Sequence, residues 1–366
     1  MREMRYLLAP RNTLIVRGPA SVQLLTGEAT ILGAPFEKGR KLIIRHEKQL
    51  PIESLSQVNL SILAGESGRV FEVEGSTIPK TWRLVVEALA EMRLGVVVVV
   101  GGTDVGKSTL CAYIGNELLS IGLPIRIIDG DIGQADIGPP ATISSAIPSD
   151  HFPSLLDLNP ERLIFIGHVT PSHVESKLIG RMKQLIDANP RHEPLTIINT
   201  DGWILGSNAI LYKINLISSI EPDLVIGIST NSELHPMLTL PRVRSMIVPA
   251  AKEVLERSRS DRRAIRQSGY RRFLDGGSVE KIPLDSIRIR KPEAFPPLQM
   301  PLNSGFRNLM VGLSNEEGYL LQVGILMNAD EHSLHIFTRS VEHVREVELG
   351  YIRLSIDGTE LGYVEN

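Results

Sequence analysis

The sequence predicts an α/β protein with three parts: a central domain built on a mainly parallel sheet, an N-terminal β domain and a C-terminal mixed α/β domain. The length of 366 residues exceeds that of one ordinary domain. Short β-branched runs before Pro79 give way to alternating helical and strand-like segments, and strand-like runs return after about residue 281. We therefore expect domains over residues 1–78, 79–280 and 281–366, with an arginine-rich helix over 252–273 inside the second.

Composition and charge exclude several classes of protein. With 42% hydrophobic and 22% charged residues the chain is too apolar for disorder, and no stretch approaches the roughly 20 apolar residues that cross a bilayer. The mixed charges of residues 1–5 are not followed by the apolar core of a secretory signal, so we expect a cytoplasmic protein with no membrane partner. The single cysteine, Cys111, excludes an intramolecular disulfide and a cysteine-based zinc cluster.

The first 78 residues have the texture of a small β domain. Apolar runs at Thr13–Val16, Ala29–Leu32 and Lys41–Ile44 are separated by glycine-containing turns. After Pro79 an apolar stripe at helical spacing predicts a helix that ends at Gly95.

The central segment has the pattern of a sheet buried on both faces. Its apolar runs are unbroken, as in parallel strands covered by helices. They are Val96–Val100, Ile125–Ile128, Leu163–Ile166, Leu195–Ile198 and Leu224–Ile228. In the third domain the expected strands are Leu309–Leu313, Leu320–Leu326 and Ile352–Ile356.

A glycine-rich motif stands between the first central strand and a helix expected over Thr109–Leu119. The glycines let backbone N–H groups converge on phosphate oxygens, Lys107 reaches β- and γ-phosphates, and the Ser108 hydroxyl can ligate Mg²⁺. The motif therefore predicts a P-loop nucleotide site, which Thr109 completes, and Cys111 is expected to pack in the following helix as a small apolar side chain. The residues that fit G-x-x-x-x-G-K-[S/T] are Gly101, Gly102, Thr103, Asp104, Val105, Gly106, Lys107 and Ser108.

Two acids, Asp129 and Asp131, follow the strand that ends at Ile128, with Gln134 three residues further on. In a P-loop fold the end of this strand faces the nucleotide. One carboxylate there can hold Mg²⁺ and the other can accept a proton from a hydroxyl nucleophile, a spacing that suits a kinase better than a hydrolase. The two roles are interchangeable at this level, and a solvated Asp-Gly-Asp turn is the alternative.

Two further polar segments, Gly167–Pro171 and Asn199–Trp203, also follow predicted strands. The carboxyl ends of strands line the ligand crevice in such sheets. Trp203 could clamp a base or a phosphate-bearing loop, and a core or rim position fits the composition nearly as well. His168, a lone histidine at a turn, is expected to be structural rather than catalytic.

A basic segment follows the α/β core. Residues 252–291 contain 12 Lys and Arg against 6 Asp and Glu, a net +6 in a chain of net charge −3. On a helix Arg259, Arg262, Arg263 and Arg266 would share one face. Such a run is usually a solvated helix face, but mobile arginines beside a P-loop can instead neutralise a transferring phosphoryl group or hold a nucleic-acid phosphate.

Together these motifs resemble the Clp/Grc-type polynucleotide 5′-hydroxyl kinases, which include the kinase of messenger RNA 3′-end processing, its ribosomal RNA-processing relative and short stand-alone archaeal members. The resemblance is carried by the P-loop, the D-x-D-x-G-Q element Asp129–Gln134, a T-x-G-W "clasp" Thr200–Trp203, and an R-x-x-x-x-R "lid" of Arg257 and Arg262. Gly167–Pro171 is a looser match to the G-x-x-[S/T]-P segment of the family. The family's layout, a central P-loop domain between an N-terminal β domain and a C-terminal mixed domain, agrees with the predicted one.

The resemblance implies transfer of the γ-phosphoryl group of ATP, with Mg²⁺, to the 5′-hydroxyl end of RNA, with DNA as a further acceptor. It implies that Lys107 and the loop amides bind the ATP phosphates while Ser108 ligates Mg²⁺. Asp131 would be the general base and Asp129 would support the metal.

The resemblance also implies roles for the lid, the clasp and the substrate end. Arg257 and Arg262 would close over the transferring phosphate, and the clasp would restrain Lys107 until substrate is present. The residues implied at the nucleic-acid end are Gln134, Thr170 and Trp203.

Two alternatives belong to other functional classes. Gly102–Ser108 is also similar to the P-loop of dethiobiotin synthetase, a carboxylating ligase of little more than half this length, which would leave the β domain, the lid and the D-x-D-x-G-Q element unexplained. The chain could instead be an ATP-binding switch or scaffold within an RNA-processing complex. Protein partners would fit that second alternative, although no motif encodes them.

Overall fold

The computed structural model describes residues 2–46, 48–188, 194–229, 231–241, 243–292, 295 and 304–364. The chain divides into two compact units, the first over residues 1–127, 147–159 and 189–261 and the second over 128–146, 160–188 and 262–366. None of the described helices combines the length and the apolar character needed to span a membrane. The domain boundaries expected at residues 78 and 280 stay a prediction.

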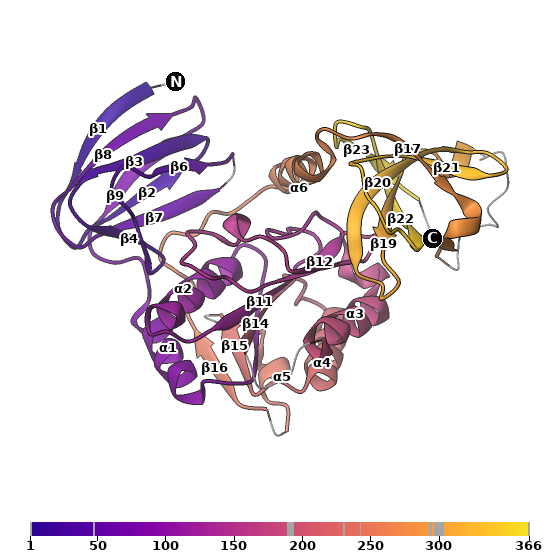
Figure 1. Cartoon of the computed structure of the whole chain (residues 1–366). Helices are drawn as coiled ribbons and strands as arrows, with labels where there is room; N and C mark the ends of the chain where they lie inside the picture. The colour runs from indigo at the N-terminus through magenta and orange to yellow at the C-terminus, as the bar shows by residue number, and fades with distance from the viewer. Residues whose placement is uncertain are drawn as a thin grey trace. The chain divides into compact units, whose positions relative to one another are not determined.

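The N-terminal β domain, which belongs to the first unit, consists of two antiparallel sheets (Figure 1). The sheets have the strand orders β1-β8-β3-β6 and β5-β4-β7-β2-β9. Along β3 and β8 every second side chain is buried, because each strand presents one face to the core. All three predicted runs lie in or overlap strands. The strands are β1 (Arg2–Leu8), β2 (Thr13–Arg17), β3 (Ala20–Thr26), β4 (Ala29–Ile31), β5 (Ala34–Pro35), β6 (Lys41–Ile44), β7 (Gln49–Ser54), β8 (Val58–Ala64) and β9 (Arg69–Val73).

The predicted helix after Pro79 is α1 (Lys80–Met92), with Trp82, Val85 and Leu89 buried. It ends before the expected Gly95, because Arg93 adopts a left-handed backbone conformation with φ of 58°.

A mainly parallel sheet follows, with strand order β13-β12-β11-β14-β10-β15-β16. The five consecutive valines of β10 are fully buried, as a central strand requires, and β10 pairs in parallel with β14 and β15. The division between the two units falls inside β11, after Ile127. The bounds of these strands, apart from β12 and β13, and of the helices beside them are β10 (Val96–Gly101), α2 (Lys107–Ser120), β11 (Ile125–Gly130), β14 (Leu195–Thr200), α4 (Ser207–Ile220), β15 (Leu224–Ile228), α5 (His235–Leu238) and β16 (Ser245–Val248).

The strand predicted over Leu163–Ile166 differs from the expectation of a parallel strand. It is β13 (Arg162–Phe165), and it runs antiparallel to β12 (Thr142–Ala146). Sequence reasoning missed β12 because its Thr-Ile-Ser-Ser-Ala run is polar, although every one of its residues is buried. Helix α3 (Glu175–Asp187) follows β13.

The arginine-rich helix is shorter than the predicted range of 252–273. It is α6 (Arg259–Leu274), and Ser258 and Asp261 form a reciprocal cap at its start. The Ser258 Oγ accepts the Asp261 backbone N–H at 3.1 Å, and the Asp261 carboxylate accepts the Ser258 N–H at 2.8 Å. Arg257 therefore lies before the helix, not on it.

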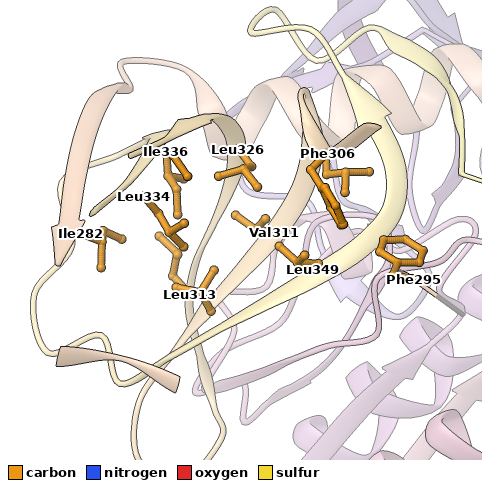
Figure 2. Close-up of a cluster of buried hydrophobic side chains, with 12 residues drawn as sticks. Ile282, Phe295, Phe306, Val311, Leu313, Leu326, Leu334, Ile336 and Leu349 are labelled. Carbon is orange, nitrogen blue, oxygen red and sulfur yellow. The ribbon is translucent and has the colours of Figure 1, made fainter. Parts of the chain in front are cut away.

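The C-terminal sheet has strand order β17-β21-β20-β19-β22-β18, with β23 on β22. Figure 2 shows its apolar core, where side chains such as Leu313, Leu334 and Leu349 come together from different strands. Beyond residue 281 the described regular structure is strands and short 3-10 turns, and α6 packs on this sheet through Tyr270 and Leu274. The strands are β17 (Ser278–Pro283), β18 (Arg288–Arg290), β19 (Leu309–Ser314), β20 (Leu320–Ala329), β21 (Ser333–Thr338), β22 (Glu346–Leu354) and β23 (Glu360–Tyr363).

Candidate active site

The phosphate loop lies in the first unit, between β10 and α2. Gly106 caps α2 with φ of 94°, a conformation that glycine adopts without steric cost. The Lys107 side chain is only 7% exposed, and its Nζ donates to the Gly102 carbonyl at 2.7 Å. Asn199 at the end of β14 donates through Nδ2 to the Ser108 Oγ at 3.3 Å. The loop, the lysine and the hydroxyl are thus held together between β10 and α2, where a helix N-terminus favours an anion.

An ion pair ties the loop to the segment before α6. The Arg257 Nη1 lies 2.9 Å from Asp104 Oδ1, and the Arg257 backbone N–H donates to the other carboxylate oxygen at 3.1 Å. Both side chains are largely buried. The structure therefore brings the first predicted lid arginine to the P-loop, through a loop residue whose side chain the motif leaves unspecified.

The clasp packs directly against the P-loop. A Cβ on Gly202 would lie 2.6–2.8 Å from three atoms of Thr103, two of them backbone, so only glycine allows this approach. Asp201 accepts the Trp203 N–H at 2.9 Å, and the Trp203 ring stacks on Tyr212 with centroids 5.6 Å apart.

Lys213 of α4 anchors the clasp through hydrogen bonds to Asp201. Its side chain is 0% exposed, and its Nζ donates to Oδ2 and to the backbone carbonyl of Asp201 at 2.8 and 2.9 Å. The Tyr212 hydroxyl donates to the same Oδ2 at 2.8 Å. A buried charge pair with this many hydrogen bonds fixes one backbone geometry for the clasp.

The D-x-D-x-G-Q element lies at the end of β11, with its acids in the second unit. Asp129 is fully buried and accepts the backbone N–H groups of Asp136 and Ile137 at 2.7 and 3.2 Å. Burial, followed by repulsion from Asp136, raises the pKa of Asp129 to about 7.

Asp131, which is half-buried, shapes the turn that follows. Its Oδ1 accepts the N–H groups of Gly133 and Gln134 at 3.1 and 3.0 Å. The Gln134 side chain donates to the Arg262 carbonyl at 3.3 Å, so the element contacts α6 within the same unit. The second unit therefore places Asp129, Asp131 and Gln134 in one turn, and this turn contacts the backbone of Arg262.

Part of the predicted guanidinium face of α6 has a structural role. The Glu360 carboxylate accepts hydrogen bonds from Nε and Nη2 of Arg266, at 2.6 and 3.0 Å, and it also forms an ion pair with Arg263. These two arginines are therefore not mobile cations awaiting an anion. Arg272, further along the helix, donates to the carbonyls of Asp136 and Ile137 at 3.1 and 2.8 Å, which anchors α6 to the turn after the D-x-D element.

Thr170 is exposed in the second unit, and its backbone N–H donates to the Nδ1 of His168 at 2.9 Å. His168 is buried beside His173 and Tyr351. Burial, followed by the charge of His173, lowers the pKa of His168 to about 4. A neutral histidine that shapes a turn agrees with the structural role expected for His168.

Each unit offers a hard oxygen donor of the kind that Mg²⁺ prefers, the Ser108 hydroxyl in the first and the Asp129 carboxylate in the second. Within the described ranges no group of three or more His, Cys, Asp or Glu side chains could hold a metal ion by itself.

The sequence analysis named Asp104 only as a position of the P-loop and Asp201 only as a position of the clasp, and it did not single out Lys213 or Arg272. The partners of Asp104 and Arg272 are more than 130 residues away in the chain. Lys213 lies 12 residues from Asp201, and its one signal is a lysine between apolar residues of the helix.

The fold and the loop define a P-loop nucleotide-binding protein of the mainly parallel α/β class. Residues 101–276 match the family model described as mRNA cleavage and polyadenylation factor CLP1 P-loop. This match lies within the central segment and confirms the resemblance drawn from the four motifs.

Similar proteins cover most of the chain. The polyribonucleotide 5′-hydroxyl-kinase of Pyrococcus furiosus is 29% identical over 320 residues, which cover 74% of this chain and 90% of that protein. The protein of the same name from Methanocaldococcus jannaschii is 27% identical over 324 residues, covering 74% and 90%. The solved structure of a wild-type Clp1p–Pcf11p complex contains a chain that matches with a TM-score of 0.75 at 14% identity, covering 96% of this chain and 98% of that one. This last likeness shows the fold.

Proposed function

We propose that this protein is an ATP-dependent polynucleotide kinase that transfers the γ-phosphoryl group of ATP to the 5′-hydroxyl end of RNA. The observation that carries the proposal is the P-loop with the clasp packed against it and Arg257 paired to it, in a chain similar over most of its length to kinases of that name. ATP, Mg²⁺ and an RNA 5′ end are the ligands that the proposal requires.

The proposed reaction is an in-line displacement. The 5′-hydroxyl oxygen forms a bond to the γ-phosphorus while the bond from that phosphorus to the β–γ bridging oxygen breaks, and ADP leaves. Asp131 accepts the proton of the hydroxyl group. Bound Mg²⁺ would neutralise phosphate charge, with Ser108 and Asp129 as the residues that hold it.

The chain's cations have separate tasks in this proposal. Lys107 exchanges the Gly102 carbonyl for phosphate oxygens when ATP binds, so its hydrogen bond in the structure keeps the ammonium group inside the loop. Arg257 and Arg262 supply positive charge to the transferring group in the transition state. Gln134, Thr170 and Trp203 contact the RNA end, Trp203 by stacking.

The test is incubation with γ-labelled ATP and matched 5′-hydroxyl and 5′-phosphorylated RNA oligomers, with DNA oligomers as a second acceptor. The proposal predicts label on the 5′-hydroxyl RNA alone among the RNAs. Release of inorganic phosphate without labelled oligomer would point to the nucleotide-switch alternative, and ATP binding without either product would point to a scaffold.

A further inference from the structure

A basic pocket lies in the second unit, outside every motif described above. It has a volume of about 430 Å³ and opens to the surface. Helix α3 contributes Lys177, Arg181 and Gln184, and the C-terminal sheet contributes Arg290 of β18 and Glu348 of β22. Three cations therefore face one carboxylate.

The pocket is built on an internal ion pair. The Lys177 Nζ donates to Glu348 Oε1 and to the Ile166 carbonyl, both at 2.6 Å. Burial lowers the pKa of Lys177, Glu348 opposes this effect, and the charges of Arg181 and Arg290 lower the pKa further. Lys177 and Glu348 thus satisfy each other, and the two arginines add positive charge beside them.

The two arginines keep hydrogen-bond donors available. Arg181 donates through Nη1 to Gln184 at 2.8 Å, and within the described ranges no carboxylate lies at ion-pair distance from it. Arg290 uses its Nε for Glu346 at 2.7 Å, a carboxylate that Arg288 shares at 3.7 Å. The Nη groups of Arg290 make no hydrogen bond to another described residue. Planar guanidinium groups of this kind match phosphate oxygens.

We propose that this pocket binds a phosphodiester group of the polynucleotide strand, with Arg181 and Arg290 donating to its oxygens. The proposal rests on the proposed function, and it adds an anchor for the strand away from the reacting end. Lys177 links the pocket to that end, because the carbonyl it holds belongs to Ile166, directly before the Gly167–Pro171 segment with its exposed Thr170. An open, electropositive pocket suits a backbone that continues past the protein better than a small enclosed ligand.

The test uses three variants: Arg181→Gln, Arg290→Gln and the double variant that combines these two substitutions. The control is Arg288→Gln. Arg288 lies on the same strand as Arg290, is 74% exposed and does not line the pocket, so Arg288→Gln removes an equal charge elsewhere. Lys177 is not substituted, because its loss would leave the Glu348 carboxylate without its ion-pair partner. Binding of a 3′-fluorescein 5′-hydroxyl RNA 20-mer is measured by anisotropy over a range of salt concentrations, and transfer to the 20-mer and to a dinucleotide is measured in parallel.

The expected result is binding to the 20-mer about tenfold weaker in the double variant, with the slope of log K against log salt smaller by about 0.7 for each phosphate that the variant no longer neutralises. The KM for the 20-mer rises, while kcat and transfer to the dinucleotide stay at wild-type values. Unchanged affinity and slope, or an equal change in Arg288→Gln, would overturn the proposal. If no variant and no wild-type protein transfers phosphate, the proposed function fails, and the anisotropy result still decides whether the pocket binds the strand.

Discussion

Replacing Lys213 by methionine is expected to destabilise the clasp strongly. The substitution keeps a side chain of similar length but removes the charge that faces Asp201 inside the protein, where the lysine is 0% exposed. Removing one partner of a buried ion pair costs about 3–5 kcal/mol, because the remaining charge is left without compensation. For a unit of this size that loss corresponds to a decrease in melting temperature of roughly 6–20 °C.

The assay is thermal and urea unfolding followed by tryptophan fluorescence, since Trp203 stacks on Tyr212, whose hydroxyl donates to Asp201. The matched controls are Asp201→Asn and the double variant with Lys213→Met. Replacing both charges removes the uncompensated carboxylate, so the double variant should be more stable than Lys213→Met alone. Two results would show that Lys213 does not compensate the buried charge of Asp201. One is a decrease in the free energy of unfolding below about 1 kcal/mol in Lys213→Met. The other is a decrease in the double variant that equals the sum of the two single decreases.

Three further predictions concern the loop, its ion pair and the turn at residue 168. Gly202→Ala forces a Cβ into the Thr103 backbone, so it should displace the clasp and reduce phosphoryl transfer by at least about tenfold, which steady-state kinetics will show; wild-type kcat would contradict the close approach. Asp104→Asn should reduce kcat in the wild-type background and have no further effect in an Arg257→Ala background, because the carboxylate acts by positioning that guanidinium group; additive effects in this double-mutant cycle would rule out the coupling. The folded-state pKa of His168 is about 4 and its ordinary value is 6.5, so the unfolded chain binds more protons between these values and stability should fall as pH decreases through that window. His168→Gln should lessen the decrease in melting temperature between pH 7 and pH 4, and an unchanged profile would show that the histidine is not held neutral.

Much of the central domain could be predicted because its signals are local. Five consecutive valines before a glycine-rich motif specify a buried strand, a phosphate loop and a helix within two dozen residues, and the structure confirms β10 and α2 there. The apolar stripe through Trp82 likewise predicted α1. These features depend on periodicity and on backbone conformations that only glycine adopts freely.

The remaining features depend on partners that are distant in the chain. Strand β12 is buried but polar, so no apolar run marks it. The arginines of α6 look alike in sequence, and only the structure shows that Glu360, almost a hundred residues later, binds Arg266. Asp104 is a similar case, because its partner Arg257 lies about 150 residues later.

In the proposed reaction Asp131 accepts a proton while the γ-phosphoryl group moves to an RNA 5′ end. The most direct measurement is the single-turnover rate of label transfer from γ-labelled ATP to a 5′-hydroxyl RNA, compared between wild type and Asp131→Asn with ATP binding and circular dichroism as controls. We predict a rate lower by about 10²–10⁴-fold in the variant with ATP affinity retained. Transfer by Asp131→Asn at the wild-type rate would contradict the account.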